Sequence, residues 1–343
     1  MRCRSVAAVV AARVQPPRAG SGLRWRSPTP ADIPAWLQLL EAAEAVDHVG
    51  ELPDADELLL EFEPDWADPE RNALFGFDGE QAVAFAWVQC NPNTTTAYRV
   101  QLGGEVHPGW RRVGVGTFLL DWLEARGRQL RTELGGDLPA NLEVRVDQHQ
   151  IDRARLLERR GFVPTRHWIQ MGRDLTDTPP PPPPLETGLV LEPYRQELDE
   201  ALRIVHNGAF ADHWGFQPRT CEEWRRWYIG HNFRGDLSRV VRDGEQIVGY
   251  CLAETYPQDA ELKGYTEAWV GVLGTRPKWR RRGIAGALLG DALRTFAAAG
   301  FDRAALGVDA ENASGALRVY ERSGFTVNKR SVTYTKPLEL RVG

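Results

Sequence analysis

The sequence predicts an α+β protein of two similar domains, each with helices packed on a mixed, mostly antiparallel sheet. Three observations predict this architecture. Short motifs recur in the same order about 165 positions apart, a proline run stands between the two copies, and strand patterns alternate with helical patterns in each copy. The 343 residues are enough for two domains that each bury a hydrophobic core.

The internal repeat is defined by four pairs of short motifs. The pairs are Asp47–Gly50 with Asp212–Gly215, Asp78–Gln81 with Asp243–Gln246, Pro108–Gly114 with Pro277–Gly283, and Gly161–Phe162 with Gly324–Phe325. Four matches in one order, with nearly constant spacing, indicate a duplicated domain.

A run of six prolines, Pro179–Pro184, lies between the copies. Proline fixes φ and has no N–H to donate, so we expect a semi-rigid extended linker over residues 177–186. A ligand for an SH3 or WW domain is the alternative interpretation. The predicted domains are therefore residues 23–176 and 187–343. Residues 1–22 contain arginines and no acidic residue, which favours a disordered tail, with a transit peptide as the alternative.

Composition and charge exclude several classes of function. The net charge is −5, which argues against a protein built to hold a polyanion such as DNA. No stretch approaches the roughly 18 apolar residues of a membrane-spanning helix. The four cysteines are scattered, without metal-ligand or disulfide-framework spacing, so we expect no metal site and a reducing, cytoplasmic compartment. They are Cys3, Cys90, Cys221 and Cys251.

Each copy begins with a short strand, Leu23–Arg26 or Leu189–Glu192, followed by helical patterns on both sides of the Asp-His-x-Gly motif. An Asp-Gly turn then predicts a hairpin. In the second copy the predicted strands are Arg239–Arg242, Gln246–Ala253, Glu267–Thr275, Arg303–Val308 and Ser331–Lys336. Apolar residues at helical spacing from Ala285 to Phe296 predict one helix, and Ser314–Arg322 predicts another.

The motif with the clearest chemistry is a strand that runs into Arg-x-x-Gly-x-Gly/Ala at the start of a helix. It occurs as 111–116 and again as 280–285. The first turn of a helix has unpaired N–H groups and a partial positive charge, small residues let the main chain approach a ligand, and arginine adds charge-assisted hydrogen bonds. The motif therefore predicts a cradle for a diphosphate. A solvated basic face or a nucleic-acid patch is the alternative for the arginines alone.

Downstream of this motif, the second copy has Asn312, Tyr320 and Gly324–Phe325. This combination resembles the GNAT superfamily of acetyl-CoA-dependent N-acetyltransferases, over about residues 23–176 and 187–340, and the tandem layout resembles mycothiol synthase-like proteins. The resemblance implies two acyl-CoA N-acyltransferase domains and transfer of acetyl from acetyl-CoA to the amine of a small molecule. A mycothiol precursor, an aminoglycoside, a polyamine and a protein N-terminus all remain open as acceptors.

The resemblance also implies roles for individual residues. In the second copy the residues expected to bind acetyl-CoA are Leu273, Gly274, Thr275, Arg280, Arg281, Arg282, Gly283, Ile284, Ala285, Gly286 and Asn312. In the first copy they are Val106, Arg111, Arg112, Gly114 and Gly116. Tyr320 would protonate the departing thiolate, since a phenol and a thiol have ordinary pKa values near 10 and 8.5. A core aromatic residue on the helix face is the alternative for Tyr320.

The amine must also lose a proton. Glu267, on the strand that enters the cradle, is the candidate base, with Glu254 a weaker one and a surface role as the alternative for Glu267. His213 and Trp214 are expected to contact the acceptor, because the superfamily usually shapes its acceptor site between the first two helices. Alternatively, the repeated Asp-His motif has only a structural role.

The two copies differ at the chemical positions. When they are aligned at Gly-Phe, Tyr320 corresponds to Leu157 and Asn312 to His149. A leucine cannot donate a proton, so we predict that only the second copy turns over. A non-catalytic acyl-CoA-binding or sensing protein is the alternative function, and a nucleic-acid module using the arginine cluster is a third.

Overall fold

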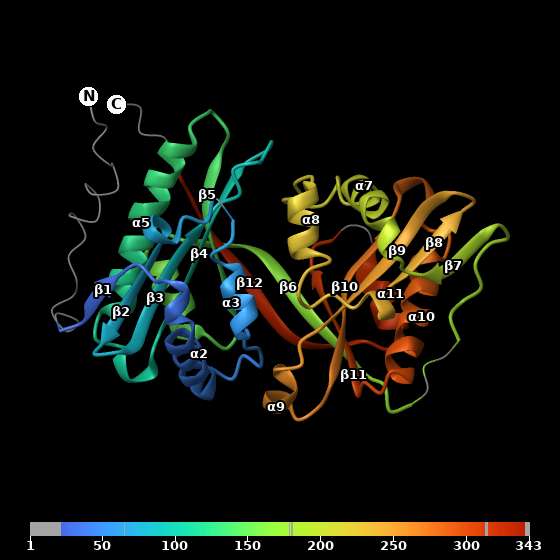
Figure 1. The fold of residues 1–343 in the computed structure, drawn as a ribbon. Coiled ribbons are helices and arrows are strands. Elements are labelled where there is room, and N and C mark those ends of the chain that lie inside the picture. The colour runs from blue at the N-terminus through green and yellow to red at the C-terminus, as the bar shows by residue number, and fades with distance from the viewer. Residues whose placement is uncertain (1–21, 65, 178, 180, 313–314, 340–343) are drawn as a thin grey trace. The chain divides into compact units, whose positions relative to one another are not determined.

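The computed structural model describes residues 22–339 except 65, 178, 180, 313 and 314 (Figure 1). The predicted tail, apart from Gly22, and Cys3 lie outside the described residues. The chain forms two compact units. Unit 1 comprises the residues up to Thr165 together with those from Val332 onward, and unit 2 comprises Arg166–Ser331.

Unit 1 contains a mixed, mostly antiparallel sheet with strand order β1-β2-β3-β4-β5, in which only β4 and β5 are parallel neighbours. Its strands are β1 (Arg24–Arg26), β2 (Ala73–Asp78), β3 (Gln81–Gln89), β4 (Tyr98–Val106) and β5 (Ala140–Asp147). Its α-helices are α2 (Ile33–Asp47), α3 (Ala55–Leu60), α4 (Pro69–Asn72), α5 (Val115–Leu134) and α6 (Ile151–Arg159). Core residues of α5 pack with one set of strand residues, and those of α2 with another.

Unit 2 repeats this plan with strand order β11-β10-β9-β8-β7, in which β10 and β11 are parallel. Its strands are β7 (Leu189–Pro193), β8 (Arg239–Asp243), β9 (Gln246–Thr255), β10 (Glu267–Thr275) and β11 (Arg303–Asp309). Its α-helices are α7 (Asp199–Ala209), α8 (Cys221–Trp227), α9 (Asp259–Lys263), α10 (Ile284–Ala298) and α11 (Ala316–Arg322). The last helix was expected to begin at Ser314, which lies outside the described residues.

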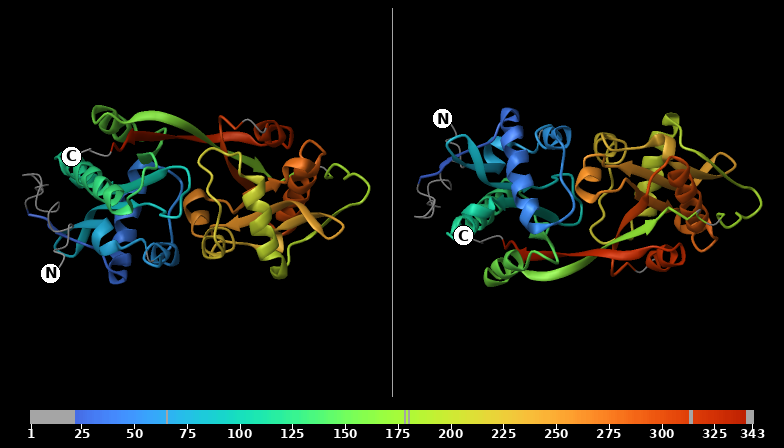
Figure 2. Two further views of the ribbon diagram at one scale, coloured as in Figure 1. Left: turned by 90° about the horizontal axis from the view of Figure 1, so that it is seen from above. Right: turned by 90° about the horizontal axis from the view of Figure 1, so that it is seen from below.

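Two long strands, β6 (Val163–Asp174) and β12 (Thr326–Pro337), are exchanged relative to the sequence repeats. From Trp168 to Asp174, β6 pairs antiparallel with β11 inside unit 2, although it follows the last helix of the first copy. The end of the chain belongs to unit 1, where Lys336 Nζ donates to Glu124 Oε2 at 2.8 Å. Figure 2 shows both strands from opposite sides.

The compact units therefore differ from the linear domains expected over residues 23–176 and 187–343. The physical reason is that strand patterning predicts that a strand forms, but not which sheet it completes. Both copies end in an equivalent strand, so the two strands are interchangeable in pattern.

The two faces of the sheet in unit 2 have different partners. On one face α10 approaches closely at Gly249, where an added Cβ would lie 2.6 Å from Ile284 Cγ2. The other face presents Tyr250, Leu252 and Val272 to residues of α7 and α8. Each face therefore has its own apolar core, as expected for a sheet covered on both sides.

The two strands of the parallel pair in each unit separate before the first of them ends. β10 pairs with β11 only from Glu267 to Val270, and the register between β9 and β10 shifts between Val270 and Val272. In unit 1, β4 pairs with β5 only from Tyr98 to Gln101. This early end to the parallel pairing leaves the last residues of β4 and β10 without a strand neighbour on one side.

The proline linker packs against α10. An added Cβ at Gly290 would lie 2.9 Å from Pro182 Cα, and one at Gly286 would lie 3.5 Å from Pro183 Cγ. Two glycines on the helix thus let the extended chain run beside it. In the described ranges, no helix is both long and apolar enough to cross a membrane.

Candidate active site

The cradle has the same backbone shape in both copies. In unit 2, β10 ends at Thr275, and α10 begins at Ile284. Between them, Arg281 (φ 63°) and Gly283 (φ 77°) adopt left-handed conformations. The equivalent residues of unit 1, Arg112 (φ 67°) and Gly114 (φ 95°), do the same. Alternation of this kind forms a nest of N–H groups in front of a helix N-terminus, which is an anion site.

The arginine side chains of the second cradle hold the loop in place. Arg280 Nη1 and Nη2 donate to the two carboxylate oxygens of Asp212 at 2.6 and 3.0 Å, and Nη2 also donates to Ala209 O at 2.6 Å. Arg282 is paired with Glu186. The guanidinium of Arg280 lowers the pKa of the Asp212 carboxyl. Main-chain amides, rather than these two guanidiniums, are therefore the groups free to meet a ligand phosphate.

A cavity of about 820 Å³ extends from this cradle into unit 2, and we call it the second cleft. It brings together most of the residues predicted from the sequence. Those that line it are Leu273, Gly274, Thr275, Arg280, Arg281, Gly283, Ile284, Ala285, Gly286, Asn312, Tyr320, His213 and Trp214. Arg282 and Glu267 are not among its lining residues.

The free edge of β10 forms one wall of the second cleft. Gly274 pairs with Tyr250 of β9, and Arg276 N–H donates to Val248 O, so these positions face β9. Because backbone groups alternate along a strand, those of Leu273 and Thr275 face the cleft. Among the described residues, the buried Thr275 Oγ1 has no hydrogen-bond partner. A buried polar atom without a partner is expected where a bound ligand supplies the hydrogen bond.

Tyr320 belongs to the core and also lines the second cleft. Its side chain is 8% exposed, and its ring meets that of Phe325 at 6.3 Å. Burial raises the pKa of Tyr320 to about 12. The phenol is therefore protonated at working pH and can act as a donor.

Neither predicted carboxylate is among the residues that line the second cleft. Glu267 stands at the start of β10, eight residues from Thr275, or roughly 26 Å along an extended strand. Its carboxylate accepts a hydrogen bond from Lys263 Nζ at 3.0 Å. The Glu254 carboxylate lies against Gly271 and accepts from Tyr256 Oη at 2.9 Å. The position of Glu267 does not support a direct base role, because a base must lie within hydrogen-bond reach of the amine. Glu254 lies against Gly271, which lines the second cleft, so its base role stays a prediction.

Aromatic side chains also line the second cleft. The rings of Trp168 and Trp214 lie 6.3 Å apart, and the Arg166 guanidinium lies 5.1 Å from the Trp214 ring centroid. Arg166 also donates to Asp309 Oδ2 at 2.8 Å through Nε. His213 lies on the same loop as Trp214, and burial lowers its pKa. Trp168 could not be found from the sequence, because its strand belongs to the first copy.

His206 is a buried residue that lines the second cleft and was not selected from the sequence. Its Nδ1 lies 2.7 Å from Tyr250 Oη, and its ring contacts those of Phe210 and Tyr228 at 4.6 and 4.5 Å. Burial lowers the pKa of His206 to about 3, so the imidazole is neutral. Other cleft residues missed by sequence reasoning are Phe216 and Arg219.

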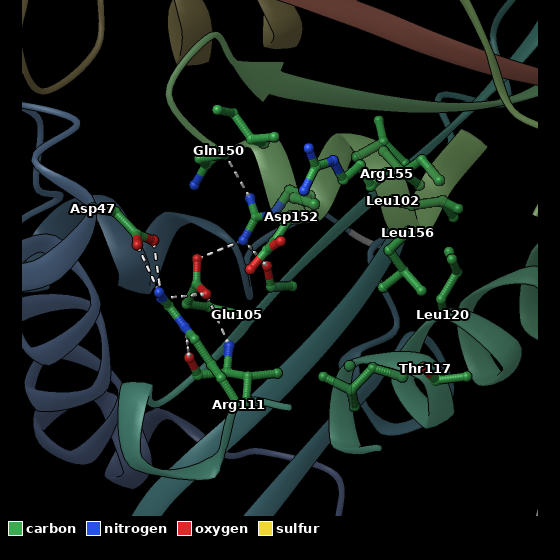
Figure 3. Close-up of a pocket in the computed structure, with 18 of the residues that line it drawn as sticks. Asp47, Leu102, Glu105, Arg111, Thr117, Leu120, Gln150, Asp152, Arg155 and Leu156 are labelled. Carbon is green, nitrogen blue, oxygen red and sulfur yellow. Dashed lines mark hydrogen bonds and ion pairs between the residues drawn. The ribbon is translucent and has the colours of Figure 1, made fainter. Parts of the chain in front are cut away.

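Unit 1 has its own cavity of about 980 Å³, which we call the first cleft (Figure 3). Its lining includes all five first-copy residues predicted to bind the cofactor, namely Val106, Arg111, Arg112, Gly114 and Gly116. Leu157 and His149 line it where the second copy has Tyr320 and Asn312. Figure 3 shows the Arg111 side chain between the carboxylates of Asp47 and Glu105.

Comparison with known proteins agrees with this geometry. Residues 198–325 match the family described as Acetyltransferase (GNAT) family. Mycothiol acetyltransferase from Geodermatophilus obscurus is 30% identical over 327 residues, covering 90% of this chain and 95% of the relative. Mycothiol acetyltransferase from Thermobispora bispora is 30% identical over 305 residues, covering 87% and 94%.

Solved structures show the same tandem fold. A GCN5-related N-acetyltransferase from Sphaerobacter thermophilus has a TM-score of 0.73 and 27% identity, covering 95% of this chain and 98% of its own. A tandem GNAT protein from the clavulanic acid biosynthesis pathway has a TM-score of 0.67 and 17% identity, covering 93% and 99%, and so shares the fold. The protein is an acetyl-CoA-dependent N-acetyltransferase that acts on an amine. With its full-length similarity to these relatives, the chain belongs to the mycothiol acetyltransferase family of tandem GNAT proteins.

Proposed function

We propose that the second cleft is where acetyl passes from acetyl-CoA to the acceptor amine, and that the first cleft does not turn over. The observation that carries this proposal is the position of Tyr320 on the wall of a cavity that begins at an anion cradle. The equivalent position of the first cleft holds Leu157, which has no proton to donate.

The cradle and the free edge of β10 would hold the cofactor. Amides from Arg281 to Ala285 would bind its diphosphate, because they surround a helix N-terminus and have left-handed residues that turn N–H groups outward. The backbone of Leu273 and Thr275 would pair with the pantetheine arm, as an added strand pairs with a sheet edge. Asn312, on the same cleft, would donate to that arm.

Tyr320 would act as the general acid. The leaving group is a thiolate, whose conjugate acid has an ordinary pKa near 8.5. A buried phenol with a pKa of about 12 stays protonated until charge develops on sulfur. Proton donation at that moment is a contribution confined to the transition state, so it raises turnover rather than cofactor affinity.

His213 would accept the proton that the attacking amine loses. It lines the second cleft, and burial lowers its pKa, so it has a free lone pair near neutral pH. Glu267 is less suitable, because it is paired with Lys263 at the far end of β10.

The acceptor would lie against Trp168 and Trp214, with Asp309 nearby. Indole faces suit the apolar faces of sugar rings, and a carboxylate suits hydroxyl or ammonium groups. The curated relatives are named mycothiol acetyltransferases, so we take the acceptor to be the amine of a mycothiol precursor. The described cysteines are free thiols, which favours the cytoplasm.

The direct test is thiol release from acetyl-CoA with a panel of amines that includes the mycothiol precursor. We expect turnover with the precursor and at least about tenfold lower kcat/KM with aminoglycosides and polyamines. Equal rates with all amines would contradict the acceptor assignment. Activity that persists unchanged in Tyr320→Phe would contradict the site assignment.

A further inference from the structure

We propose that Glu105 and Arg153 close the first cleft to the pantetheine arm, so that the chain binds one acetyl-CoA, in the second cleft. This inference rests on the proposed function of the second cleft as the cofactor site. It concerns two side chains to which the chemistry above gives no role, and both line the first cleft.

The edge of β4 that would bind the pantetheine arm is already occupied. Arg153 Nη2, from α6, donates to Gly104 O at 3.1 Å. Val106 N–H donates to Glu105 Oε1 at 2.9 Å. Gly104 O and Val106 N–H are the carbonyl and amide that face the cleft, at the positions of Leu273 and Thr275 in the second copy. The groups with which a pantetheine arm would pair are therefore satisfied by the protein itself.

The side chains of Glu105 and Arg153 also bind each other. Arg153 Nη2 donates to Glu105 Oε2 at 2.5 Å, while Arg111 Nη2 donates to Glu105 Oε1 at 3.2 Å. Arg111 is in turn fixed by Asp47, to which Nη1 donates at 2.6 Å. The Glu105 side chain is only 13% exposed. An entering arm would have to break several charge-assisted hydrogen bonds, which are stronger than the neutral ones it would form.

The second cleft has different residues at both positions. Strands β4 and β10 correspond with an offset of 169 residues, which aligns Glu105 with Gly274. The offset of 163 at Gly-Phe aligns Arg153 with Ala316. Both closing residues are thus replaced by the two smallest amino acids. Gly274 and Ala316 line the second cleft, and neither has a polar side chain that could cap Leu273 O or Thr275 N–H.

The cradle itself does not separate the copies, because Arg112 and Gly114 have the same left-handed backbone as Arg281 and Gly283. CoA was predicted to bind to Val106, Arg111, Arg112, Gly114 and Gly116. What opposes this binding is therefore the occupied edge of β4, and not the cradle. Glu105 and Arg153 are specificity-determining residues. They occupy the backbone groups of β4 with which the pantetheine arm would form hydrogen bonds.

The test is the stoichiometry of CoA binding, measured by isothermal titration calorimetry on the full chain. We expect one site in the wild-type protein. The double variant Glu105→Gly with Arg153→Ala carries the second copy's residues at both positions. It should gain a second CoA site, in the first cleft. The affinity of that cleft for CoA should be at least about tenfold higher in the variant than in the wild type. Arg153→Ala alone, a change on a helix surface, should give an intermediate gain.

The matched control is Arg26→Ala with Asp32→Ala, which removes another bidentate ion pair of unit 1 outside the first cleft. It should bind one CoA. Two wild-type sites of similar affinity would overturn the proposal, as would folded variants that all keep one site. Absence of any CoA site in the wild type would instead overturn the proposed function of the second cleft, so the two failures are distinguishable.

Discussion

Arg280 and Asp212 form a bidentate ion pair, with N···O distances of 2.6 and 3.0 Å, that joins the cradle to the loop after α7. Arg111 and Asp47 form the same pair in the first copy, at 2.6 and 2.9 Å. The Asp-His-x-Gly motif and the cradle motif are far apart in the sequence of each copy. In the structure they are therefore joined by this ion pair. The pair aligns the start of the helix with the loop that carries His213 and Trp214.

Replacing Asp212 with Ala should free Arg280 and loosen the cradle. Because Asp212 is largely exposed, the loss is worth about 1 kcal/mol, and the KM for acetyl-CoA should rise by roughly threefold to tenfold. Steady-state kinetics would measure this change. Asp47→Ala, which breaks the matching pair of unit 1, should change KM by less than about twofold. Equal effects of the two variants would contradict the assignment of the cofactor to the second cleft.

The pH dependence should include an acidic limb from His213. The imidazole accepts a proton only when neutral, and burial places its pKa below 6.5. Activity should therefore hold down to about pH 6.5 and fall as His213 becomes protonated at lower pH. His213→Gln should reduce kcat by about tenfold to a hundredfold and abolish this limb in the profile of kcat against pH. An unchanged limb in the variant would assign the proton acceptor elsewhere.

The Tyr320 hydroxyl should titrate far above an ordinary tyrosine. Its pKa is raised to about 12 by burial, so the phenol stays neutral through the working range. A difference titration of tyrosinate absorbance, wild type minus Tyr320→Phe, should show a midpoint near 12. A midpoint at or below 10 would mean that the side chain is solvated and does not line a dry cleft.

His206 should make the fold sensitive to acid. Its folded-state pKa of about 3 lies below the unfolded value near 6.5, so the unfolded chain binds the proton more tightly. The stability present above pH 6.5 is therefore lost progressively as the pH falls toward 3. When the pH is lowered from 6.5 to 4.5, the free energy of unfolding should fall in both proteins. The fall should be smaller in His206→Gln than in the wild type, by roughly 2 kcal/mol. Urea unfolding at both pH values would measure this, and parallel losses would contradict a buried, neutral imidazole.

The sequence predicted the parts of the fold that have local causes. The Asp-Gly turns led to hairpins β2–β3 and β8–β9, and the apolar spacing from Ala285 predicted α10. The cradle was also accessible, because its chemistry is contained within one strand–loop–helix segment. Most of the predicted cleft residues follow from that segment and from Asn312 and Tyr320, and they line one cavity.

What the sequence could not predict depends on contacts between distant segments. The exchange of β6 and β12 places Trp168 beside Trp214, although their positions belong to different copies. Glu267 looked suitable on a strand face, yet only the structure shows Lys263 holding its carboxylate. Likewise, Glu105 and Arg153 are unremarkable in the sequence, and their shared contact with the edge of β4 exists only in the folded chain.

The turnover number of Tyr320→Phe in acetyl transfer to the mycothiol precursor tests the central claim most directly. Tyr265→Phe is the matched control, because it removes a hydroxyl outside the second cleft. We predict that Tyr320→Phe lowers kcat by about a hundredfold or more with an unchanged KM for acetyl-CoA, while the control stays within twofold of the wild type. Equal turnover in all three proteins would contradict the account, because Tyr320 would then serve only to pack the core.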